Sequence, residues 1–191
     1  MSKETKTKGT SFRDGMYGST IILFIICLVI SGALAVTHQM TAPQIEKINK
    51  ETADAARMAV LPEADSFTPQ EGSLPEGVAE YYVADNGAGV VVTAQNSSFG
   101  GTITVMVGID AEGSISGVTV TDHSDTPGLG TKAMDAGYLS QYQGLAALDD
   151  VDNIKKDSQV DEVTGATVSS NGIYGAVKYA LAAYQEMGGS N

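Results

Sequence analysis

The longest apolar segment of the chain is MYGSTIILFIICLVISGALAV, which runs from Met16 to Val36 without a charged residue. A helix of that length rises about 30 Å, which is close to the hydrocarbon thickness of a bilayer. The pattern therefore predicts a transmembrane helix over residues 16–36. A cleaved signal peptide is the alternative, because Ala33-Leu34-Ala35 resembles a cleavage site, but the apolar run exceeds the usual length of a signal core.

Charged residues on the two sides of this segment indicate its orientation. Residues 1–15 contain four Lys or Arg residues, whereas only Lys47 and Lys50 follow the segment closely. The positive-inside rule therefore predicts a cytoplasmic N-terminus over residues 1–15. It also predicts that the C-terminal part is extracytoplasmic and that a single pass holds the chain in the cell membrane.

A helical spacing continues beyond the apolar segment. From Ile45 onward, mostly apolar residues recur every three or four positions. The spacing predicts a helical stalk from about Thr41 to Leu61, which Pro62 ends. The polar, proline-containing stretch PEADSFTPQEGSLPEG follows it, so we interpret residues 37–76 as stalk and linker.

Four segments rich in β-branched residues follow, and turn residues separate them. The segments cover residues 78–84, 88–95, 101–110 and 115–123. Asp85-Asn86-Gly87 and the stretch Asp110-Ala111-Glu112-Gly113 are typical of hairpin turns. The pattern therefore predicts antiparallel strands joined by hairpins.

Helical patterns return after the strands. One short helix is expected around residues 132–138, within a region of weak periodicity. The apolar stripe of a last helix consists of Ile173, Val177, Leu181 and Tyr184. Gly188-Gly189 is expected to end that helix. Antiparallel strands with helices beside them predict the α+β class, with an antiparallel-sheet domain over residues 77–191 and a C-terminal helix.

Charge and cysteine content exclude several functions. The net charge is −12, and the residues after Val36 hold 7 basic against 21 acidic side chains. That charge repels nucleic acid.

Cys27 is the single cysteine, and the sequence contains no cysteine or histidine cluster. The chain alone therefore offers no zinc, haem or iron–sulfur site, and no metal site is predicted.

The segment after the last predicted strand contains a candidate ligand loop. Thr126-Pro127-Gly128 is typical of a type II turn, because proline presets the first φ and glycine accepts the positive φ that follows. Gly130 is a second place where backbone can approach another group closely. Two interpretations stay open, namely a tight loop after a strand or a ligand site lined by Leu129 and exposed N–H groups. His123 by itself is more typical of a solvated strand end than of a catalyst.

A second candidate is the hydroxyl-rich stretch from Thr164 to Ser170, just before the last helix. One interpretation is that Ser169 or Ser170 caps the helix and that Gly165 lies in a turn. The other is that the helix start binds a phosphate, because its N–H groups lack partners and the small Gly165 and Ala166 leave room. The residues alone favour neither interpretation. A hydrolytic nucleophile is disfavoured, because no nucleophile motif or neighbouring base is present.

The stretch Asp161-Glu162-Val163-Thr164-Gly165-Ala166-Thr167 resembles the attachment motif D-x-x-[S/T]-G-A-T of the FMN-binding domain family. The resemblance implies that Thr167 carries FMN covalently through a phosphoester bond. It also implies that a separate flavin transferase, with FAD as donor, installs the FMN. Asp161 would serve recognition by the transferase, or metal binding during attachment, rather than electron transfer.

A second part of the chain resembles the same family. Gly100-Gly101 precedes one predicted strand and His123-Ser124-Asp125-Thr126-Pro127-Gly128-Leu129-Gly130 follows the next, in the order of the family's second signature. The family usually has glutamate where this chain has Asp125. The two motifs together imply a flavin site made of His123, Asp125, Thr126, Pro127, Gly128, Leu129 and Gly130 on one wall, with Thr164, Gly165, Ala166, Val168 and Ser169 beside Thr167.

The order of anchor, stalk and both motifs is similar to that of the G subunits of Rnf complexes. The C subunits of sodium-pumping NADH:quinone oxidoreductases are a related alternative, although they are typically longer. The resemblance implies a redox subunit, not catalytic alone, that relays electrons in a membrane-bound ferredoxin:NAD oxidoreductase coupled to sodium or proton transport. Its partners would be the other membrane subunits of the complex. The remaining alternative is a membrane-anchored binding or scaffold domain without a redox cofactor.

Overall fold

The computed structural model describes residues 16–70, 72–149 and 151–187. The predicted cytoplasmic segment 1–15 and the predicted helix end at Gly188-Gly189 lie outside these residues. The chain divides into two compact units, one up to Glu51 and one from Thr52 onward.

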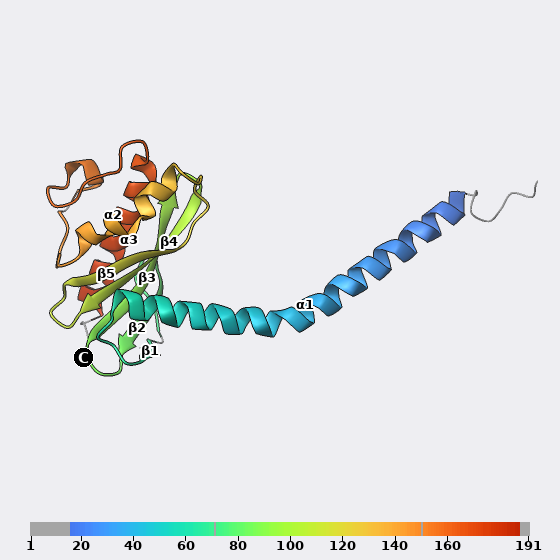
Figure 1. Cartoon of the computed structure of the whole chain (residues 1–191), viewed down its shortest axis with the longest axis horizontal. Coiled ribbons are helices and arrows are strands. Elements are labelled where there is room, and N and C mark those ends of the chain that lie inside the picture. The colour runs from blue at the N-terminus through green and yellow to red at the C-terminus, as the bar shows by residue number, and fades with distance from the viewer. Residues whose placement is uncertain (1–15, 71, 150, 188–191) are drawn as a thin grey trace, which may run out of the picture. The chain divides into compact units, whose positions relative to one another are not determined.

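Helix α1, Met16–Val60, forms the described part of the first unit and ends within the second (Figure 1). This one helix contains both the predicted membrane segment and the predicted stalk. Among the described residues, it is the one helix that is long and apolar enough to cross a membrane. Its large apolar side chains from Ile21 to Val36 are exposed, and those of Leu23 and Phe24 are exposed by 62% and 66%. Exposed apolar surface of this extent is stable in lipid, so α1 indicates association with a membrane.

The second unit contains a five-stranded antiparallel sheet in which each strand pairs with the next one in the sequence. The strands are β1 Phe67–Pro69, β2 Val78–Ala84, β3 Gly89–Ser98, β4 Gly101–Asp110 and β5 Ile115–Asp122. The four predicted strands and both predicted hairpins are confirmed. Strand β1 was not predicted, because three residues that include a proline give no strand pattern. Pro69 is tolerated there because β1 is an edge strand.

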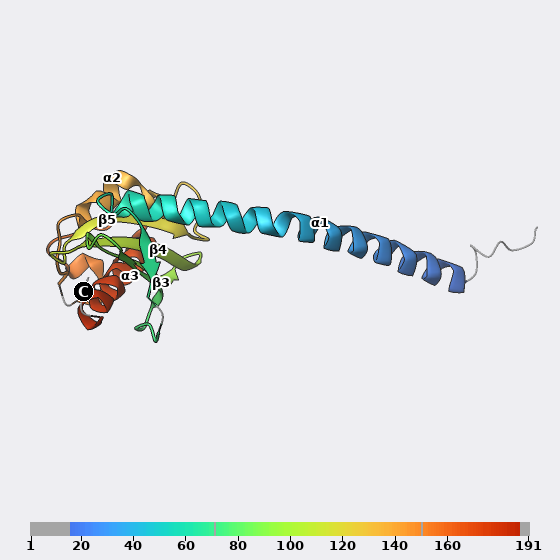
Figure 2. The same ribbon diagram turned by 90° about the horizontal axis from the view of Figure 1, so that it is seen from below.

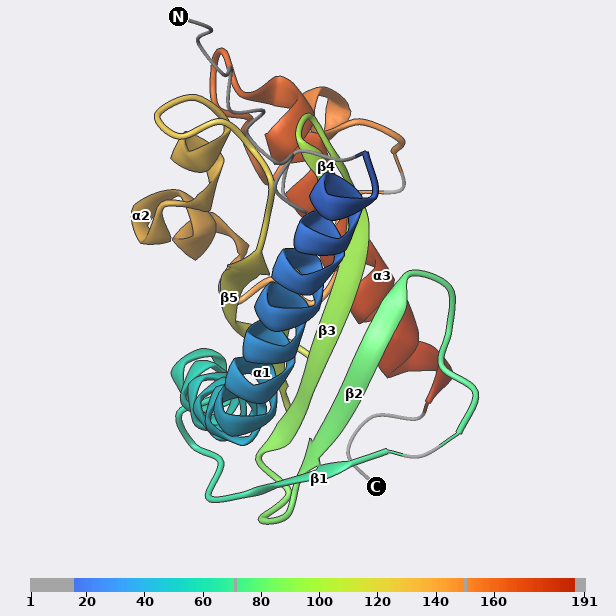
Figure 3. The same ribbon diagram turned by 90° about the vertical axis from the view of Figure 1, so that its right-hand side faces the viewer.

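Helix α3, Thr167–Glu186, covers one face of this sheet (Figures 1 and 3). It confirms the predicted C-terminal helix. Strand side chains alternate between the two faces, so every second residue of β3 and β4 points toward α3. The buried core between them includes Val90, Val92, Val105, Val107, Ile173 and Val177. An antiparallel sheet with a helix packed on it is the α+β class that the sequence predicts.

Short turns replace the single helix that was predicted over residues 132–138. They are the 3-10 turn η2 Gly130–Met134 and the one-turn helix α2 Ala136–Leu139; the further 3-10 turns η3 Ser140–Tyr142 and η4 Ile154–Lys156 follow. The break falls at Asp135, which has an extended backbone with φ −66° and ψ 136°. The Asp135 carboxylate accepts a hydrogen bond from the Gly137 N–H at 2.9 Å. Asp135 therefore caps a new helix, and one continuous helix does not form.

The last turn of α1 packs on the opposite face of the sheet (Figure 2). A second apolar cluster there includes Val60, Leu61, Ala64, Ala84, Val91 and Met106. Two facing glycines, Gly108 and Gly117, let the chain approach, because a Cβ on Gly108 would overlap the Val60 carbonyl oxygen. The same oxygen accepts a hydrogen bond from Ser116 Oγ at 2.6 Å. The end of α1 is thus fixed to β4 and β5.

Arg57 adds polar contacts to this attachment. Its guanidinium lies 3.7 Å from the centroid of the Tyr82 ring. It also pairs with Asp54 at 2.6 Å and with Glu80 at 3.4 Å. Arg57 is 6% exposed, so the cation–π contact forms with little competing water.

We expect Gly108→Ala to lower the free energy of unfolding of the second unit by about 1–3 kcal/mol, because the added methyl group collides with the Val60 carbonyl. This corresponds to a fall in melting temperature of roughly 3–10 °C. Circular dichroism of the full chain in detergent measures it. Thr102→Ala, at an exposed position of the same strand, is the matched control. An unchanged melting temperature for Gly108→Ala would contradict the close contact.

Candidate functional site

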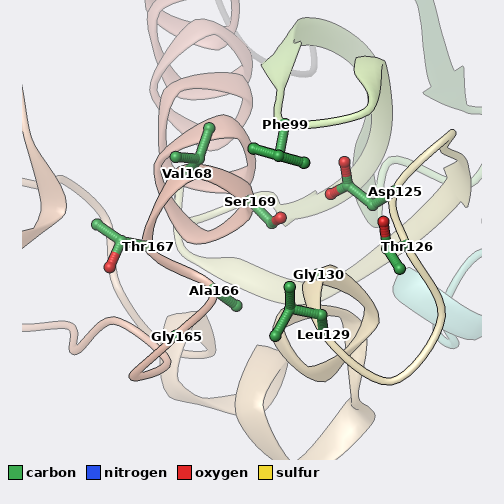
Figure 4. Close-up of a pocket in the computed structure, with 10 residues that line it drawn as sticks. All are labelled: Phe99, Asp125, Thr126, Leu129, Gly130, Gly165, Ala166, Thr167, Val168 and Ser169. Atoms are coloured by element: carbon green, nitrogen blue, oxygen red, sulfur yellow. The ribbon is translucent and has the colours of Figure 1, made fainter.

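A cavity of about 310 Å³ lies where three separate segments of the second unit meet (Figure 4). Phe99 comes from the tip of the β3–β4 hairpin. Asp125, Thr126, Leu129 and Gly130 come from the loop after β5, and residues 165–169 come from the turn before α3 and its first residues. The two motifs singled out in the sequence therefore line the same cavity.

The Asp125 carboxylate ties these segments together. It accepts hydrogen bonds from Ser98 Oγ at 2.5 Å and from the Gly100 N–H at 2.6 Å. The Ser169 hydroxyl also bonds to it. Asp125 is 4% exposed, and burial alone would raise its pKa. The three hydrogen bonds and the nearby His123 outweigh burial and hold the pKa of Asp125 below its usual range, so the carboxylate stays ionised.

Two glycines let the backbone segments approach at this point. A Cβ on Gly100 would overlap the carbonyl oxygen of Ser124. A Cβ on Gly130 would lie 2.8 Å from both Asp125 Cβ and Ser169 Oγ. Neither position has room for a larger residue, which confirms the close approach predicted at Gly130.

The loop after β5 contains the predicted turn. The Leu129 N–H donates to the Thr126 carbonyl at 3.2 Å, and Gly128 has a φ of +78°. That positive φ is the one a type II turn requires, so the predicted role of Gly128 is confirmed. The turn places the Leu129 side chain on the cavity.

Three large apolar side chains line the accessible part of the cavity. Phe99, Leu129 and Val168 are exposed by 73%, 49% and 51%. Figure 4 shows Phe99 between the start of α3 and the loop that carries Asp125. Exposed apolar groups around a cavity, beside a few polar atoms, are typical of a site for a ligand with apolar faces.

Helix α3 begins earlier than the serine-capping prediction requires. Its first residue is Thr167, and its N-cap residue Ala166 has no side-chain capping bond. Ser169 and Ser170 lie inside the first turn and are buried. The Ser170 hydroxyl accepts a hydrogen bond from the Val163 N–H at 3.1 Å. The prediction that Ser169 or Ser170 caps the helix is therefore wrong, because a preceding turn forms the helix entry instead.

That turn is centred on Gly165. The Ala166 N–H donates to the Val163 carbonyl at 2.9 Å, and Gly165 has a φ of +85°. The predicted turn at Gly165 is therefore confirmed. A Cβ on Gly165 would meet no atom within 4 Å, so the space beside this turn is open.

The start of α3 offers an electropositive group to the cavity. The first intrahelical bond runs from the Ser170 N–H to the Ala166 carbonyl at 2.9 Å. The N–H groups of residues 167–169 precede it and have no backbone acceptor among the described residues. Together with the positive end of the helix dipole, such groups suit an anion, a phosphate in particular.

Most, but not all, of the residues predicted for the site line the cavity. His123, Pro127, Gly128 and Thr164 lie in the same loops but are not among the lining residues. Asp161 lies apart from the cavity lining, and its backbone exchanges two hydrogen bonds with the Gln141 side chain at 2.8 and 3.2 Å. Phe99 was missed. The available signal was a single aromatic residue in the polar hairpin tip Asn96-Ser97-Ser98-Phe99-Gly100.

The sheet with its covering helix, and the apolar cavity at a helix N-terminus, define a ligand-binding domain linked to an apolar helix. Residues 98–182, which contain both motifs, match the family described as FMN-binding domain. The G subunit of the sodium-translocating ferredoxin:NAD oxidoreductase complex of Acetobacterium woodii is 30% identical to this chain over 205 residues, which cover 96% of this chain and 99% of the relative. The chain belongs to this family of G subunits of ion-translocating oxidoreductase complexes.

Two further comparisons accompany this result. The G subunit of the proton-translocating ferredoxin:NAD oxidoreductase complex of Clostridium ljungdahlii is 24% identical over 177 residues, which cover 88% of this chain and 91% of the relative. The crystal structure of NqrC from Shewanella oneidensis matches with a TM-score of 0.46 and 25% identity, over 68% of this chain and 70% of that one.

We expect Asp125→Asn to lower the free energy of unfolding at neutral pH by about 1–3 kcal/mol, because an amide cannot replace both acceptor oxygens of the buried carboxylate. The folded-state pKa lies below the unfolded value of about 3.9, so the stabilisation is lost as pH falls. The difference between wild type and variant should therefore shrink below about pH 4.

Thermal melts of the full chain in detergent at pH 7 and pH 3.5 test this expectation. Asp122→Asn, an exposed carboxylate at the end of β5, is the matched control. Equal stability of wild type and Asp125→Asn at neutral pH would show that the carboxylate does not hold the site together.

Proposed function

We propose that this chain is an electron-relay subunit of an Rnf-type ferredoxin:NAD oxidoreductase complex and that its FMN is covalently attached to Thr167 through a phosphoester. The main support is the cavity, which brings both motifs of the FMN-binding domain onto one site at the start of α3. The subunit is not catalytic alone, because it provides one cofactor site and needs an electron donor and an acceptor.

The residues on the cavity fit the flavin ring. A volume of about 310 Å³ is at the lower end of the range for ligand sites, which suits a planar ring system with the rest of the nucleotide outside. Phe99, Leu129 and Val168 supply apolar surface for its faces. Thr126 and the start of α3 supply polar groups at its edge.

The residues at the start of α3 fit the phosphate. Thr167 is the first residue of the helix, and the N–H groups of residues 167–169 in the same turn have no backbone acceptor among the described residues. They would stabilise the negative charge of a phosphodiester. Gly165 leaves open space beside the preceding turn, since a Cβ there would meet no atom within 4 Å.

When bound, FMN supplies the redox chemistry, since it accepts and releases electrons singly or in pairs. The chain's own residues position and shield it. Asp125 fixes the loop and the hairpin, Phe99 and Leu129 exclude water from one side, and the helix start holds the phosphate. We further propose that His123, Pro127, Gly128 and Thr164 support this wall from behind, and that Asp161 serves recognition by the flavin transferase.

Covalent attachment has a physical advantage at the proposed location. We propose that α1 crosses the membrane over residues 16–36, that residues 1–15 are cytoplasmic, and that residues 77–191 form an extracytoplasmic domain joined by the stalk and linker of residues 37–76. Outside the cytoplasm, a dissociated FMN would be lost, so a covalent bond retains it. Anchoring also raises the effective concentration of the flavin near the other membrane subunits.

The coupled ion is either sodium or a proton. The relative from Acetobacterium woodii is named as sodium-translocating, and that from Clostridium ljungdahlii as proton-translocating. The predicted membrane segment of this chain, residues 16–36, contains no charged residue. We therefore infer that the ion crosses through other subunits, because ion pathways usually contain ionisable groups within the membrane.

The attachment is tested by purifying the full chain from cells that also express a flavin transferase. We expect the wild type to carry the mass of one FMN and to fluoresce on a denaturing gel. Thr167→Ala should lose both signals completely, because it lacks the acceptor oxygen. Thr52→Ala, an exposed threonine of α1 outside both motifs, is the matched control and should keep them.

Two outcomes would overturn the attachment. One is a wild-type band without flavin despite an active transferase, and the other is an equally labelled Thr167→Ala. A labelled Thr167→Ala together with an unlabelled Thr164→Ala would instead move the acceptor to Thr164.

The ring site is tested with Phe99→Ala. Attached FMN should raise the free energy of unfolding of the wild type, and this increase should be smaller by about 0.5–1.5 kcal/mol in Phe99→Ala, because an aromatic contact to the ring is lost. Melting the flavin-loaded and flavin-free full chains of both proteins measures it. Phe67→Ala, in β1, should lower the free energy of unfolding of the flavin-loaded and the flavin-free chain equally. An unchanged increase in Phe99→Ala would place the ring elsewhere.

A further inference from the structure

The Thr167 side chain is directed away from the centre of the cavity. Figure 4 shows it pointing outward from the first turn of α3, on the side opposite Asp125 and Thr126. The Thr167 hydroxyl is hydrogen-bonded to the carboxylate of Glu162. The proposed acceptor oxygen is thus in contact with a potential base of the same chain.

Glu162 is enclosed by groups from three elements. Its Oε1 lies 3.1 Å from Lys155 Nζ of η4, and its side chain is 22% exposed. Tyr138 of α2 and Thr167 of α3 are the other groups that face it. Its second oxygen, Oε2, is buried and has no hydrogen-bond partner among the described residues. The carboxylate of Glu162 therefore has acceptor capacity that no donor among the described residues uses.

The protonation states in this cluster are suited to proton transfer. The Thr167 hydrogen bond, assisted by Lys155 and opposed by burial, lowers the pKa of Glu162, so the carboxylate is ionised at neutral pH. Burial raises the pKa of Tyr138, so the phenol stays neutral. The ionised carboxylate of Glu162, in contact with the Thr167 hydroxyl, can therefore accept its proton.

We propose that Glu162 accepts the proton of Thr167 during FMN attachment and that Lys155 then pairs with the new phosphodiester. The inference rests on the proposed attachment at Thr167. It adds that the modified chain, and not the transferase alone, supplies the chemistry of its own modification.

The step balances with a flavin nucleotide pyrophosphate as the donor. Thr167 Oγ1 forms a bond to the phosphorus on the flavin side, and the bond from that phosphorus to the bridging oxygen breaks. The nucleoside monophosphate leaves with the bridging oxygen, and the hydroxyl proton passes to Glu162. An ionised carboxylate takes the hydroxyl proton in the same way in protein kinases.

Proton transfer also changes the charge balance at the start of α3. An ionised Glu162 would repel a phosphodiester on Thr167, whereas a protonated one does not. Protonation of Glu162 also releases Lys155 from its ion pair. The Lys155 side chain is 56% exposed and can turn toward the phosphodiester. A Lys–phosphate pair replaces the Lys–carboxylate pair, so Lys155 retains a partner of opposite charge.

The test is the rate of FMN transfer to the full chain in detergent, with purified flavin transferase, FAD and Mg²⁺, followed by intact mass at pH 6 to 9. We expect Glu162→Gln to slow the transfer about 100-fold, which is a usual contribution of a general base. The wild-type rate should change little over this range, and the Glu162→Gln rate should rise by about tenfold per pH unit, because hydroxide replaces the lost base.

Glu162→Asp keeps a carboxylate and should retain more of the rate than Glu162→Gln, with the pH dependence of the wild type. Glu112→Gln, an exposed carboxylate in the β4–β5 turn, is the matched control and should react like the wild type. Melting temperatures verify that each variant is folded.

Three results separate the possibilities. A Glu162→Gln variant with the rate and pH dependence of the wild type would overturn the role of Glu162 and leave the attachment at Thr167 intact. Equal slowing of Glu162→Gln and Glu162→Asp without a change in pH dependence would show that Glu162 has a structural role only. This result would also overturn its role as the proton acceptor. A wild type that accepts no FMN would overturn the proposed function itself.

Discussion

The ionised carboxylate of Asp125 is the interaction on which the site depends. It is buried, and it receives hydrogen bonds from the β3–β4 hairpin and from the first turn of α3. A buried charge is stable only when such donors surround it. The ion therefore forces the hairpin, the loop after β5 and the helix start to lie together, and the cavity is the space that they leave.

The same arrangement gives the cavity two chemically different ends. Phe99, Leu129 and Val168 make one end apolar, and the unpaired N–H groups at the start of α3 make the other end suitable for an anion. A flavin nucleotide has the matching division, with a planar ring and a charged phosphate. Thr167 stands at the start of α3, where the proposed bond to the phosphate would leave the ring free to reach the apolar end.

The sequence predicted most of the fold because the strands and α3 each bury a periodic apolar face. It predicted the turns at Gly128 and Gly165 because glycine accepts the positive φ that both turns require, and Pro127 presets the φ before Gly128. It did not reveal that Asp125 joins three segments, because hydrogen bonds between residues far apart in the chain leave no local pattern. The prediction that Ser169 or Ser170 caps the helix failed for the same reason. A serine that caps a helix and a buried serine that bonds to groups elsewhere in the fold look alike in the sequence. Glu162 lies at a position of the attachment motif where any residue is allowed, so the motif indicates no role for it. Its contact with Lys155 becomes visible only in the fold.

The most direct test is to locate the flavin on the chain purified from its native membrane. Trypsin is expected to release the peptide from Asp157 to Lys178, which contains Thr164, Thr167 and both serines of the first turn of α3. Fragmentation of this peptide should place FMN, joined as a phosphoester, on Thr167. An unmodified peptide, or FMN on another hydroxyl, would contradict attachment at Thr167.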